Sequence, residues 1–552
     1  MNEWWRRAVV YQIYPKSFND TTGNGVGDIQ GIIEKLDYLH TLGVDVLWVT
    51  PIYESPQKDN GYDISDYFSI HEEYGTMADF EKLLDEVHAR GMKLIMDLVV
   101  NHTSTEHKWF KEAIASGDSQ YRHYYIWKDP VDGGEPSNWQ SKFGGNAWEY
   151  DEKSGQYYLH LFDVTQADLN WENEELRHAV YDMMHFWFEK GIDGFRLDVI
   201  NLISKDQSFP NDHDGDGRRF YTDGPRVHEF LQEMNQAVLS KYDSMTVGEM
   251  SSTSIEHCIN YSNPNRNELS MTFNFHHLKV DYPNGEKWAL ADFDFQALKD
   301  ILSTWQVEMH KGGGWNALFW CNHDQPRVVS RYGNAEDYHQ KSAKMLAAAI
   351  HMMQGTPYIY QGEEFGMTNP KFESIDQYRD VETLNYYKRM KKEGNSEEEI
   401  MAIIKEKSRD NSRTPVQWND QPHGGFTTGT PWINVAENYK EINAEQALKD
   451  NDSIFYFYQK LIRLRHELAI VTEGVYRRLD QKHPQLFLYE RVKENEKLLV
   501  INNFYDQDVT FDIPAEWQED LNAELLLSNG SERKLEKKMT LSPYDSLIFH
   551  KK

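Results

Sequence analysis

The sequence predicts an α/β protein built on a (β/α)8 barrel, with an irregular domain inserted after the third strand and a small antiparallel β domain at the C-terminal end. Three observations support this fold class: eight short β-rich runs in the first 365 residues, amphipathic helical patterns between several of them, and short alternating segments near the end. The runs are mostly continuous, as expected for strands buried on both faces. Eight strands alternating with helices are typical of a closed barrel, and a doubly wound open sheet is the main alternative.

The barrel elements can be followed along the chain. The eight β-rich runs begin at Val9, Val44, Lys93, Gly191, Met245, Met271, Asn316 and Pro357. Between the second and third runs, DFEKLLDEVHARG predicts an amphipathic helix that begins with Asp79 as its N-cap and ends at a glycine. After the eighth run, a polar stretch around Lys388 to Lys407 predicts further helix.

The spacing of the runs locates the added domains. Most runs follow one another after about 25 to 55 residues, but nearly a hundred separate the third from the fourth. The middle of this gap is rich in Gly, Trp and Tyr and lacks helical periodicity, so we expect an irregular β domain over residues 102–170 that overhangs the barrel mouth. The barrel then comprises residues 1–101 and 171–470. The alternating segments LFLYERV and LLVINNF predict the C-terminal β domain over residues 471–552.

Composition excludes several classes of protein. Of the 552 residues, 39% are hydrophobic, which excludes a disordered or fibrous chain. The 58 basic and 89 acidic residues give a net charge of −31, so we expect neither nucleic acid nor an anionic membrane as a partner. Cys258 and Cys321 are too few for a disulfide framework, and neither a signal peptide nor a membrane span is visible. We therefore expect a cytoplasmic protein.

Charged and polar groups stand at the ends of four predicted strands. In a barrel, the carboxyl ends of the strands form one face, so these groups should converge at one mouth despite their separation in sequence. Any one carboxylate alone could belong to a structural ion pair, but the whole set favours an active site. Its members are Asp97, His102, Arg196, Asp198, Glu249, His323 and Asp324.

These residues carry a family resemblance. DLVVNH, GFRLDVI, GEM and NHD resemble the four short motifs of the α-amylase superfamily of glycoside hydrolases, in their usual order. NGYDISDY from Asn60 and RDNSRTPVQW from Arg409 extend the resemblance, which is closest to the branch of oligo-1,6-glucosidases and trehalose-6-phosphate hydrolases. It implies a barrel with an inserted domain and a C-terminal β domain, and an α-glucosidase that needs no cofactor for catalysis.

The resemblance also implies catalytic roles. Asp198 corresponds to the nucleophile, Glu249 to the acid/base, and Asp324 to a third carboxylate that binds sugar hydroxyls. Cleavage with retention needs a carboxylate and a protonated carboxylic acid about 5 to 5.5 Å apart. Arg196, two residues before Asp198 and on the same strand face, is expected to keep Asp198 ionised, while Glu249 must retain its proton near neutral pH.

The other rim residues imply a closed, glucose-sized pocket and therefore exo-action. By resemblance, Tyr62 would stack beneath the sugar ring, and His102 and His323 would bond its hydroxyls. Asp63 paired with Arg409 would hold the non-reducing end. From the residues alone, Tyr62 could also be a packed core aromatic. Similarly, Arg413 would share a face with Arg409 if this segment is helical.

Substrate choice depends on weaker similarities. Val199, directly after Asp198, matches the branch that acts on α-1,6 and related linkages rather than on starch. Segments from Phe220 and Phe275 resemble trehalose-6-phosphate hydrolases more than oligo-1,6-glucosidases. This similarity implies that the substrate is a phosphorylated disaccharide, trehalose 6-phosphate, cleaved to glucose and glucose 6-phosphate. Isomaltose-like oligosaccharides are the alternative substrate.

The segment from Phe275 contains a cluster of nitrogen-bearing side chains. Lysine serves as a point-charge ligand for phosphate, so this cluster is a candidate site for the phosphate of the leaving sugar. Lys279 is the principal candidate, with help from His276 or His277, and Lys287 lies downstream. The alternative is that these are ordinary surface residues.

The segment NDTTGNGVGDIQG resembles the calcium or magnesium loop of the family. Its candidate ligands are Asp20, Asn24, Val26 through its carbonyl, and Asp28. A glycine-stabilised turn without metal is the alternative. Two other functions also stay open from sequence: a non-catalytic binding or transporter-partner protein on the same fold, and a transferase or sucrose isomerase with the same carboxylates.

Overall fold

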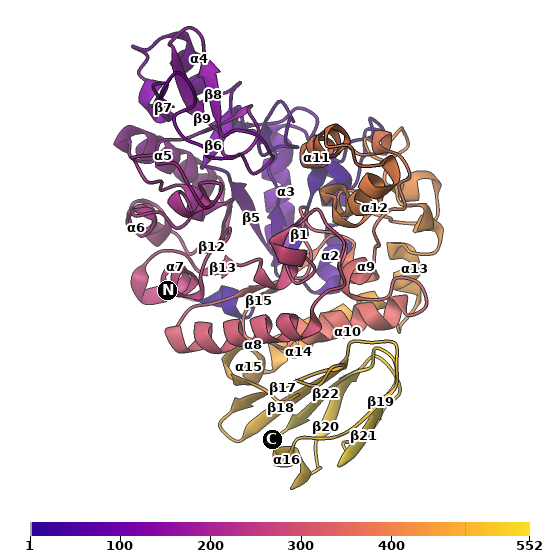
Figure 1. The fold of residues 1–552 in the computed structure, drawn as a ribbon. Coiled ribbons are helices and arrows are strands. Elements are labelled where there is room, and N and C mark those ends of the chain that lie inside the picture. Colours follow the sequence, from indigo (N-terminus) through magenta and orange to yellow (C-terminus); the bar gives the residue numbers. More distant parts are fainter. Residues whose placement is uncertain (1–2, 481) are drawn as a thin grey trace.

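The computed structural model describes residues 3–480 and 482–552. At its centre, eight parallel strands form one sheet in the order β13-β12-β11-β5-β2-β1-β15-β14. A bridge between Thr272 and Asn316 links the two edge strands, so the sheet is a nearly closed barrel (Figure 1). This architecture confirms the predicted barrel and excludes the open sheet.

All eight predicted barrel strands are present and almost completely buried. They are β1 (Val10–Ile13), β2 (Val46–Val49), β5 (Lys93–Leu98), β11 (Gly194–Leu197), β12 (Met245–Glu249), β13 (Met271–Phe273), β14 (Ala317–Leu318) and β15 (Thr356–Tyr360). Their registers bring Arg196 of β11 beside Asp97 of β5. The polar ends of neighbouring strands therefore meet at one rim.

Helices surround the barrel. They are α1 (Ile29–Glu34), α2 (Leu36–Leu42), α3 (Met77–Ala89), α5 (Glu174–Lys190), α6 (Val227–Ala237), α7 (Ile255–Ser262), α8 (Phe295–Gly312), α9 (Val328–Tyr332) and α10 (His339–His351). The helix predicted from Asp79 exists as α3, but its predicted N-cap is wrong. Thr76 is the N-cap, and Asp79 lies in the first turn, where its side chain completes a capping box with Thr76.

The insertion after β5 forms a small domain of its own, at the top of Figure 1. Its elements are β6 (His102–Ser104), α4 (Lys108–Ala115), β7 (Trp127–Lys128), β8 (Trp148–Asp151), β9 (Gln156–Leu159) and β10 (Gln166–Asp168). Strands β7, β9 and β8 form an antiparallel sheet, and β10 pairs with β6. The predicted β character is present, but the sequence analysis missed the helix α4.

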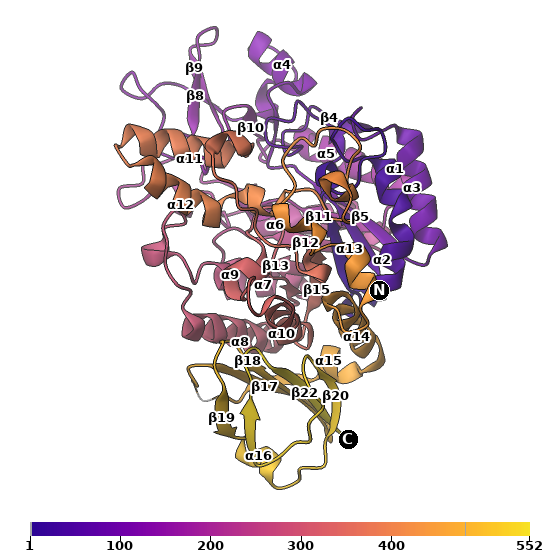
Figure 2. The ribbon, with the colours of Figure 1, turned by 90° about the vertical axis from the view of Figure 1, so that its right-hand side faces the viewer.

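Two helices after β15 form a second wall of the rim. The polar stretch around Lys388 to Lys407 is not one helix but two, α11 (Val381–Lys392) and α12 (Glu397–Lys407), which lie on the same side of the barrel as the inserted domain (Figure 2). The remaining elements of the barrel region are β3 (Tyr53–Glu54), β4 (Asp66–Ile70), α13 (Ala444–Lys449), α14 (Ile454–Glu467) and α15 (Ala469–Glu473).

The C-terminal region is antiparallel, as predicted. Its main sheet has the order β16-β17-β18-β22-β20, and β19 pairs with β21. The bounds are β16 (Val475–Arg478), β17 (Leu486–Lys493), β18 (Glu496–Asn503), β19 (Val509–Asp512), α16 (Ala515–Gln518), β20 (Glu524–Ser528), β21 (Lys538–Leu541) and β22 (Ser546–Lys551). This domain lies below α8 and α10, opposite the rim.

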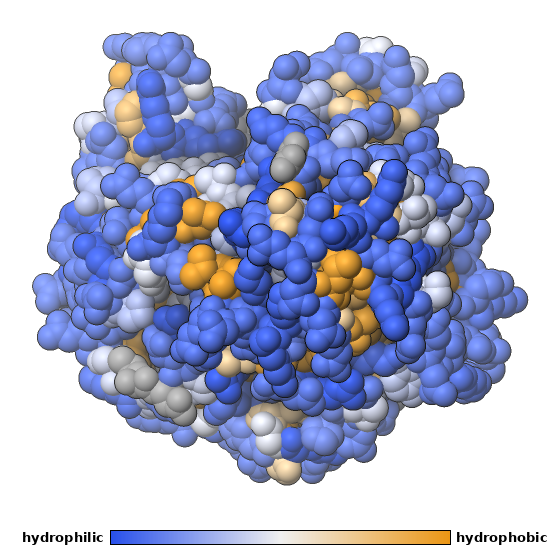
Figure 3. Space-filling view, turned by 90° about the horizontal axis from the view of Figure 1, so that it is seen from below, coloured by the Kyte–Doolittle hydropathy of each residue, from blue (hydrophilic) through white to orange (hydrophobic). Residues whose placement is uncertain are grey.

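The face seen from below is mostly hydrophilic, with only small apolar patches (Figure 3). No helix in the described part of the chain is both long and apolar enough to cross a membrane.

Candidate active site

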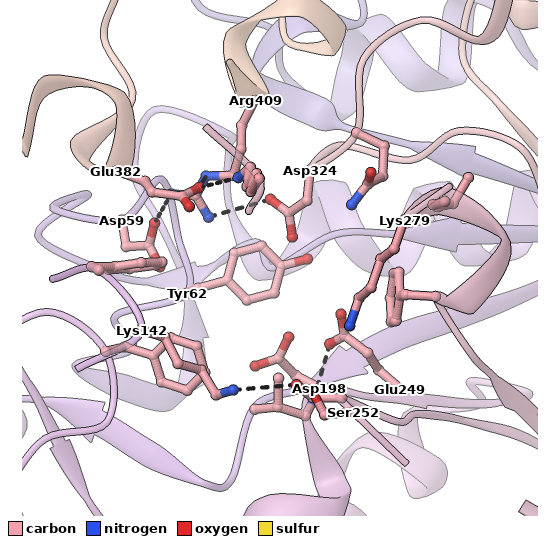
Figure 4. A pocket seen from close by; sticks show the side chains of 18 of the residues that line it. Asp59, Tyr62, Lys142, Asp198, Glu249, Ser252, Lys279, Asp324, Glu382 and Arg409 are labelled. Carbon is pink, nitrogen blue, oxygen red and sulfur yellow. Dashed lines mark hydrogen bonds and ion pairs between the residues drawn. The ribbon is translucent and has the colours of Figure 1, made fainter. Parts of the chain in front are cut away.

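A cavity of about 240 Å³ lies at the carboxyl ends of the barrel strands, between the inserted domain and α11 (Figure 4). Its walls come from the barrel, the inserted domain and the segment after β15. The predicted site residues that line it are Tyr62, His102, Asp198, Glu249, Lys279, Asp324 and Arg409. The structure therefore brings together side chains that are hundreds of residues apart in sequence.

One guanidinium joins three carboxylates beneath this cavity. Arg196 Nη1 lies 2.8 Å from Asp97 Oδ1 and 2.7 Å from Asp198 Oδ1, and its Nη2 lies 2.6 Å from Glu249 Oε2. The expected contact between Arg196 and Asp198 is therefore present. The additional contacts show that Arg196 binds both Asp198 and Glu249 and does not contact Asp198 alone.

The charges of this cluster do not balance. Burial raises the pKa of Asp198, and the nearby Glu249 raises it further, while Arg196 opposes the shift. Burial likewise raises the pKa of Asp97 against the pull of Arg196. Because three carboxylates share one cation, we expect the ligand-free cluster to retain a proton near neutral pH.

The backbone turns sharply after β11 and positions Glu249. Val199, directly after Asp198, has φ 36° and ψ 39°, a left-handed conformation that is strained for a β-branched residue. In this turn the Val199 N–H donates a hydrogen bond of 3.0 Å to Glu249 Oε2. The strained turn therefore links the end of β11 to the end of β12.

Asp324 is held in its ionised form from two sides. Its Oδ1 lies 2.7 Å from Arg413 Nη2 and 3.3 Å from Arg409 Nη1, and its Oδ2 lies 3.3 Å from His323 Nε2. Burial alone would raise the pKa of Asp324, but His323 and the two arginines outweigh it and hold the pKa well below its usual range. Asp324 thus presents a fixed negative charge to the cavity.

His323 lies behind the cavity wall and is neutral. Burial lowers its pKa to about 3, against the opposing charge of Asp324. A neutral ring with Gln12 Nε2 2.8 Å from its Nδ1 accepts a hydrogen bond there, so its Nε2 carries the proton and donates to Asp324. The ring also stacks on Tyr62, with centroids 5.0 Å apart and an interplanar angle of 5°.

Tyr62 and His102 line the cavity but are held by protein contacts. Tyr62 Oη donates to Asp97 Oδ2 at 3.0 Å. His102 Nε2 donates to the Tyr62 carbonyl at 3.0 Å, its Nδ1 lies 3.2 Å from Asn101 Nδ2, and burial lowers its pKa to about 4. Both rings are therefore fixed, and their contacts with a sugar stay predictions.

The predicted pair between Asp63 and Arg409 is wrong. Asp63 is fully buried and accepts hydrogen bonds from the backbone N–H groups of Lys58 and Asp59, at 2.8 and 3.0 Å, and thereby closes a turn. Asp59 takes the expected position instead, with its Oδ1 3.1 Å from Arg409 Nη2. Burial raises the pKa of Asp59 to about 7, and Arg409 opposes this shift.

Arg409 is the centre of a larger ion-pair network that the sequence analysis missed. Its Nη2 lies 2.6 Å from Asp380 Oδ1, and its Nε lies 3.5 Å from Glu382 Oε2. Residues Arg409–Ser412 form a single 3-10 turn, so Arg409 and Arg413 do not share a face of an α-helix, although both reach Asp324. The two acidic residues at the start of α11 carry no distinguishing sequence signal.

The predicted cluster of nitrogen groups after β13 is only partly correct. Lys279 is exposed at the rim of the cavity and lines it. The ring of His276 packs on Trp305, with centroids 5.3 Å apart, and His277 donates a hydrogen bond of 2.8 Å to the Phe319 carbonyl. Neither histidine lines the cavity, so their predicted help in binding phosphate is not supported by the geometry.

Two further lysines line the cavity. Lys287 forms an ion pair of 2.7 Å with Glu382 at the start of α11. Lys142 comes from the inserted domain and was not among the candidates that the sequence analysis named. It lies in a Gly-rich segment with no motif around it, which is why it was missed.

The predicted metal loop is held by its own donors. Asp20 accepts hydrogen bonds from the backbone N–H groups of Thr22, Gly23 and Gly25 and from the Thr427 hydroxyl, and Asp28 caps α1. These hydrogen bonds hold both carboxylates in place within the loop. In the described residues, no group of three His, Cys, Asp or Glu side chains could hold a metal ion. A calcium or magnesium ion here stays a prediction.

The fold and the carboxylate set define a glycoside hydrolase. The alpha amylase catalytic-domain family matches residues 12–474, and the alpha-amylase SusG C-terminal domain family matches residues 486–548. The chain belongs to the α-amylase family.

Individual similar proteins indicate the branch of the α-amylase family to which the chain is similar. The chain is 70% identical to the trehalose-6-phosphate hydrolase of Bacillus subtilis (strain 168), with 99% of this chain and 98% of the relative covered. It is 53% identical to the oligo-1,6-glucosidase of Bacillus cereus, with 99% of each covered. A crystal structure of the trehalose-6-phosphate hydrolase of Bacillus licheniformis superposes with a TM-score of 0.96 at 68% identity and covers 100% of both chains. The predicted branch is thereby confirmed.

Proposed function

We propose that the enzyme hydrolyses trehalose 6-phosphate to glucose and glucose 6-phosphate, with retention at the anomeric carbon. The observation that carries this proposal is Lys279, an exposed lysine without an ion-pair partner among the described residues. It lies at the rim of a cavity that Asp198 and Glu249 also line. In a chain of net charge −31, a free cation there suits an anionic substrate. The similarity to two trehalose-6-phosphate hydrolases supports the same substrate.

In this mechanism, Asp198 attacks the anomeric carbon while Glu249 donates its proton to the leaving oxygen, which breaks the glycosidic bond. Water then enters, Glu249 takes a proton from it, and the glycosyl ester on Asp198 is hydrolysed. A single planar guanidinium holds both carboxylates, and this arrangement suits the short separation of a retaining pair.

The carboxylate cluster around Arg196 can supply the proton that this mechanism needs. Asp97, Asp198 and Glu249 share the single cation of Arg196, so the cluster can retain a proton, and in this mechanism Glu249 delivers it to the leaving oxygen. When Asp198 becomes an ester it loses its charge, and Arg196 then stabilises Glu249 as the base for water.

Asp324 and the Arg409 network would hold the glucose ring. Asp324 is ionised and faces the cavity, so it can accept hydrogen bonds from two sugar hydroxyls. The ion pair of Asp59 and Arg409 lines the cavity together with Tyr62. We propose that this pair blocks one end of the cavity, so that only a terminal glucose fits and the enzyme is exo-acting.

Isomaltose-like oligosaccharides are the second candidate substrate, because Val199 and the identity to an oligo-1,6-glucosidase favour them. We also propose a cytoplasmic location, which two buried free cysteines, Cys258 and Cys321, support.

The deciding experiment compares kcat/KM for trehalose 6-phosphate, trehalose and isomaltose. We expect trehalose 6-phosphate to exceed trehalose by about tenfold or more, because one charge-assisted contact contributes about 1.5 to 3 kcal/mol. Equal activity on the two would contradict the proposal, and a preference for isomaltose would favour the second candidate.

A further inference from the structure

Lys142 is a charged side chain that the proposed chemistry does not use. It projects from the inserted domain, between β7 and β8, into the cavity near Asp198 and Glu249 (Figure 4). Within residues 3–480 and 482–552, its ammonium forms no ion pair, and its hydrogen bond goes to the Ser251 hydroxyl at 3.3 Å. A lysine that is partly buried without a carboxylate partner needs an explanation.

The surroundings of Lys142 disfavour its charge. Burial lowers its pKa to about 7, and repulsion from Arg218 lowers it further. Asp216 opposes this shift, Lys279 adds a smaller repulsion, and Glu249 opposes it least. Arg218 also lowers the pKa of Lys279, after burial. Lys142 and Lys279 therefore both line the cavity without an ion-pair partner in the described chain, and Arg218, which pairs with Asp216 at 3.1 Å, repels both.

Such an arrangement is costly until an anion binds. Like charges close to a partly buried lysine destabilise the empty protein, and a ligand of opposite charge reverses that cost. The leaving sugar of the proposed substrate carries an anion of this kind, and Glu249, which would protonate the leaving oxygen, lies in the same wall.

We infer that Lys142 of the inserted domain and Lys279 of the barrel together bind the phosphate of the leaving sugar, with the Ser251 hydroxyl beside them. The inference rests on the proposed function and assigns its phosphate site to two domains. Since the two lysines come from separate parts of the fold, bound phosphate would tie the inserted domain to the barrel rim. Selectivity for phosphate then depends on the position of the inserted domain.

Lys287 provides a matched control. It lines the same cavity, but its charge is already neutralised by Glu382 at 2.7 Å. Its substitution removes a lysine from the cavity wall without removing an unpaired charge. A selectivity effect confined to Lys142 and Lys279 would therefore arise from free charge and not from the mere presence of a lysine.

The test measures kcat/KM for trehalose 6-phosphate and for 4-nitrophenyl α-glucoside in Lys142→Met, Lys279→Met, the double variant and Lys287→Met. We expect the ratio of the two values to fall about ten- to a hundredfold in each of the first two variants, and to stay unchanged in Lys287→Met. Lys142→Met should melt at the same or a higher temperature, because it removes an unpaired charge. An unchanged ratio in Lys142→Met would overturn the inference.

Two further readouts separate phosphate binding from other roles. If Lys142 merely tuned Glu249, Lys142→Met would shift the pH profile for the aryl glucoside; we expect the profile to keep its shape, and a shift would contradict the inference. Inorganic phosphate should raise the melting temperature of the wild type but not of the double variant. If phosphate stabilised the wild type and the double variant equally, the proposed phosphate site would be contradicted.

The outcomes also separate this inference from the proposed function. If the wild type does not favour trehalose 6-phosphate but phosphate still stabilises it through the two lysines, the proposed function fails while the anion site stands. If trehalose 6-phosphate is favoured and Lys142→Met keeps the full ratio, the function stands and the inference fails.

Discussion

At the scale of single residues, the catalytic cluster has one cation for three carboxylates. Arg196 contacts Asp97, Asp198 and Glu249, so none of the three can be altered without changing the balance of the other two. Their protons are therefore best described as belonging to the cluster. The roles of Asp198 and Glu249 must be separated by chemistry and not by pKa alone.

The first prediction distinguishes the roles of Asp198 and Glu249 by comparing substrates with different leaving groups. Asp198→Asn should abolish hydrolysis of every substrate, because no glycosyl ester can form. Glu249→Gln should lose about 10²- to 10⁴-fold on a disaccharide, whose leaving oxygen needs a proton, yet keep a fast first step on an aryl α-glucoside with an acidic phenol. The measurement is the burst of phenol release. Equal release by both variants would refute the assignment.

The residue scale is also where sequence reasoning was least complete. The motifs identified Arg196, Asp198, Glu249 and Asp324 because strand ends fix where such side chains lie. Asp59 and Asp63 stand four residues apart in one turn, and only the conformation of that turn decides which carboxylate reaches Arg409 and which accepts backbone N–H groups. No periodic pattern encodes that choice.

At the scale of elements, the continuous apolar runs predicted the barrel strands correctly, since burial on both faces leaves a direct trace in sequence. The helix α4 and the division between α11 and α12 left weaker traces, because short helices on a rim are half-exposed. Lys142 was missed because no motif surrounds it and because its place in the cavity depends on how the inserted domain packs on the barrel.

A buried ion pair anchors that domain. Lys205 Nζ lies 3.1 Å from Asp168 Oδ2 of β10 and donates to the Asn101 side chain at 3.1 Å and the Leu202 carbonyl at 2.8 Å. Both charged side chains are almost inaccessible to solvent. The pair therefore connects the inserted domain to the segment that follows β11.

The second prediction concerns this pair. Lys205→Met should lower the free energy of unfolding by about 3 to 5 kcal/mol, because Asp168 is left buried without its partner. Adding Asp168→Asn should recover part of the loss, since the amide oxygen can still accept the N–H of Leu161, which lies 2.8 Å from Asp168 Oδ1. Urea unfolding of the single and double variants measures both. A double variant less stable than Lys205→Met would show that the pair itself is not the source of the loss.

The third prediction concerns the loop before α1. A calcium or magnesium ion bound there would act through stability, because Asp20 and Asp28 supply no group to the cavity. EDTA should therefore leave kcat unchanged at a temperature where the fold persists, and lower the melting temperature if an ion is bound. Calorimetry and rate measurements on the same sample give both quantities, and immediate loss of turnover in a folded sample would contradict the assignment.

At the scale of the whole molecule, no single unit of the fold contains the site. The barrel supplies the carboxylates, the inserted domain supplies Lys142, and the segment after β15 supplies Glu382 and Arg409. The C-terminal domain lies on the opposite side and supplies no residue of the cavity wall described here. A change that loosens the packing among these three units should therefore alter substrate selectivity, even where the barrel itself stays folded.

The fold also buries titratable groups that do not line the cavity, and the last prediction concerns one of them. His351, at the end of α10, is 2% exposed and lies edge-on to Tyr458, with ring centroids 5.3 Å apart. Burial, with a smaller contribution from Arg465, lowers its pKa to about 3. The unfolded chain binds a proton at this position below about pH 6.5, whereas the native protein does not until about pH 3.

His351 therefore contributes stability that is fully present above about pH 6.5 and is lost as the pH falls toward 3. Between pH 7 and pH 5 the loss from this one group should be about 2 kcal/mol in the free energy of unfolding. In His351→Gln the acid-induced loss should be smaller than in the wild type by about that amount, whatever the stability of the variant at pH 7. Urea unfolding at the two pH values measures the difference, with the exposed His213→Gln as the control. An identical loss in the wild type and His351→Gln would show that His351 is protonated equally in the native and unfolded states.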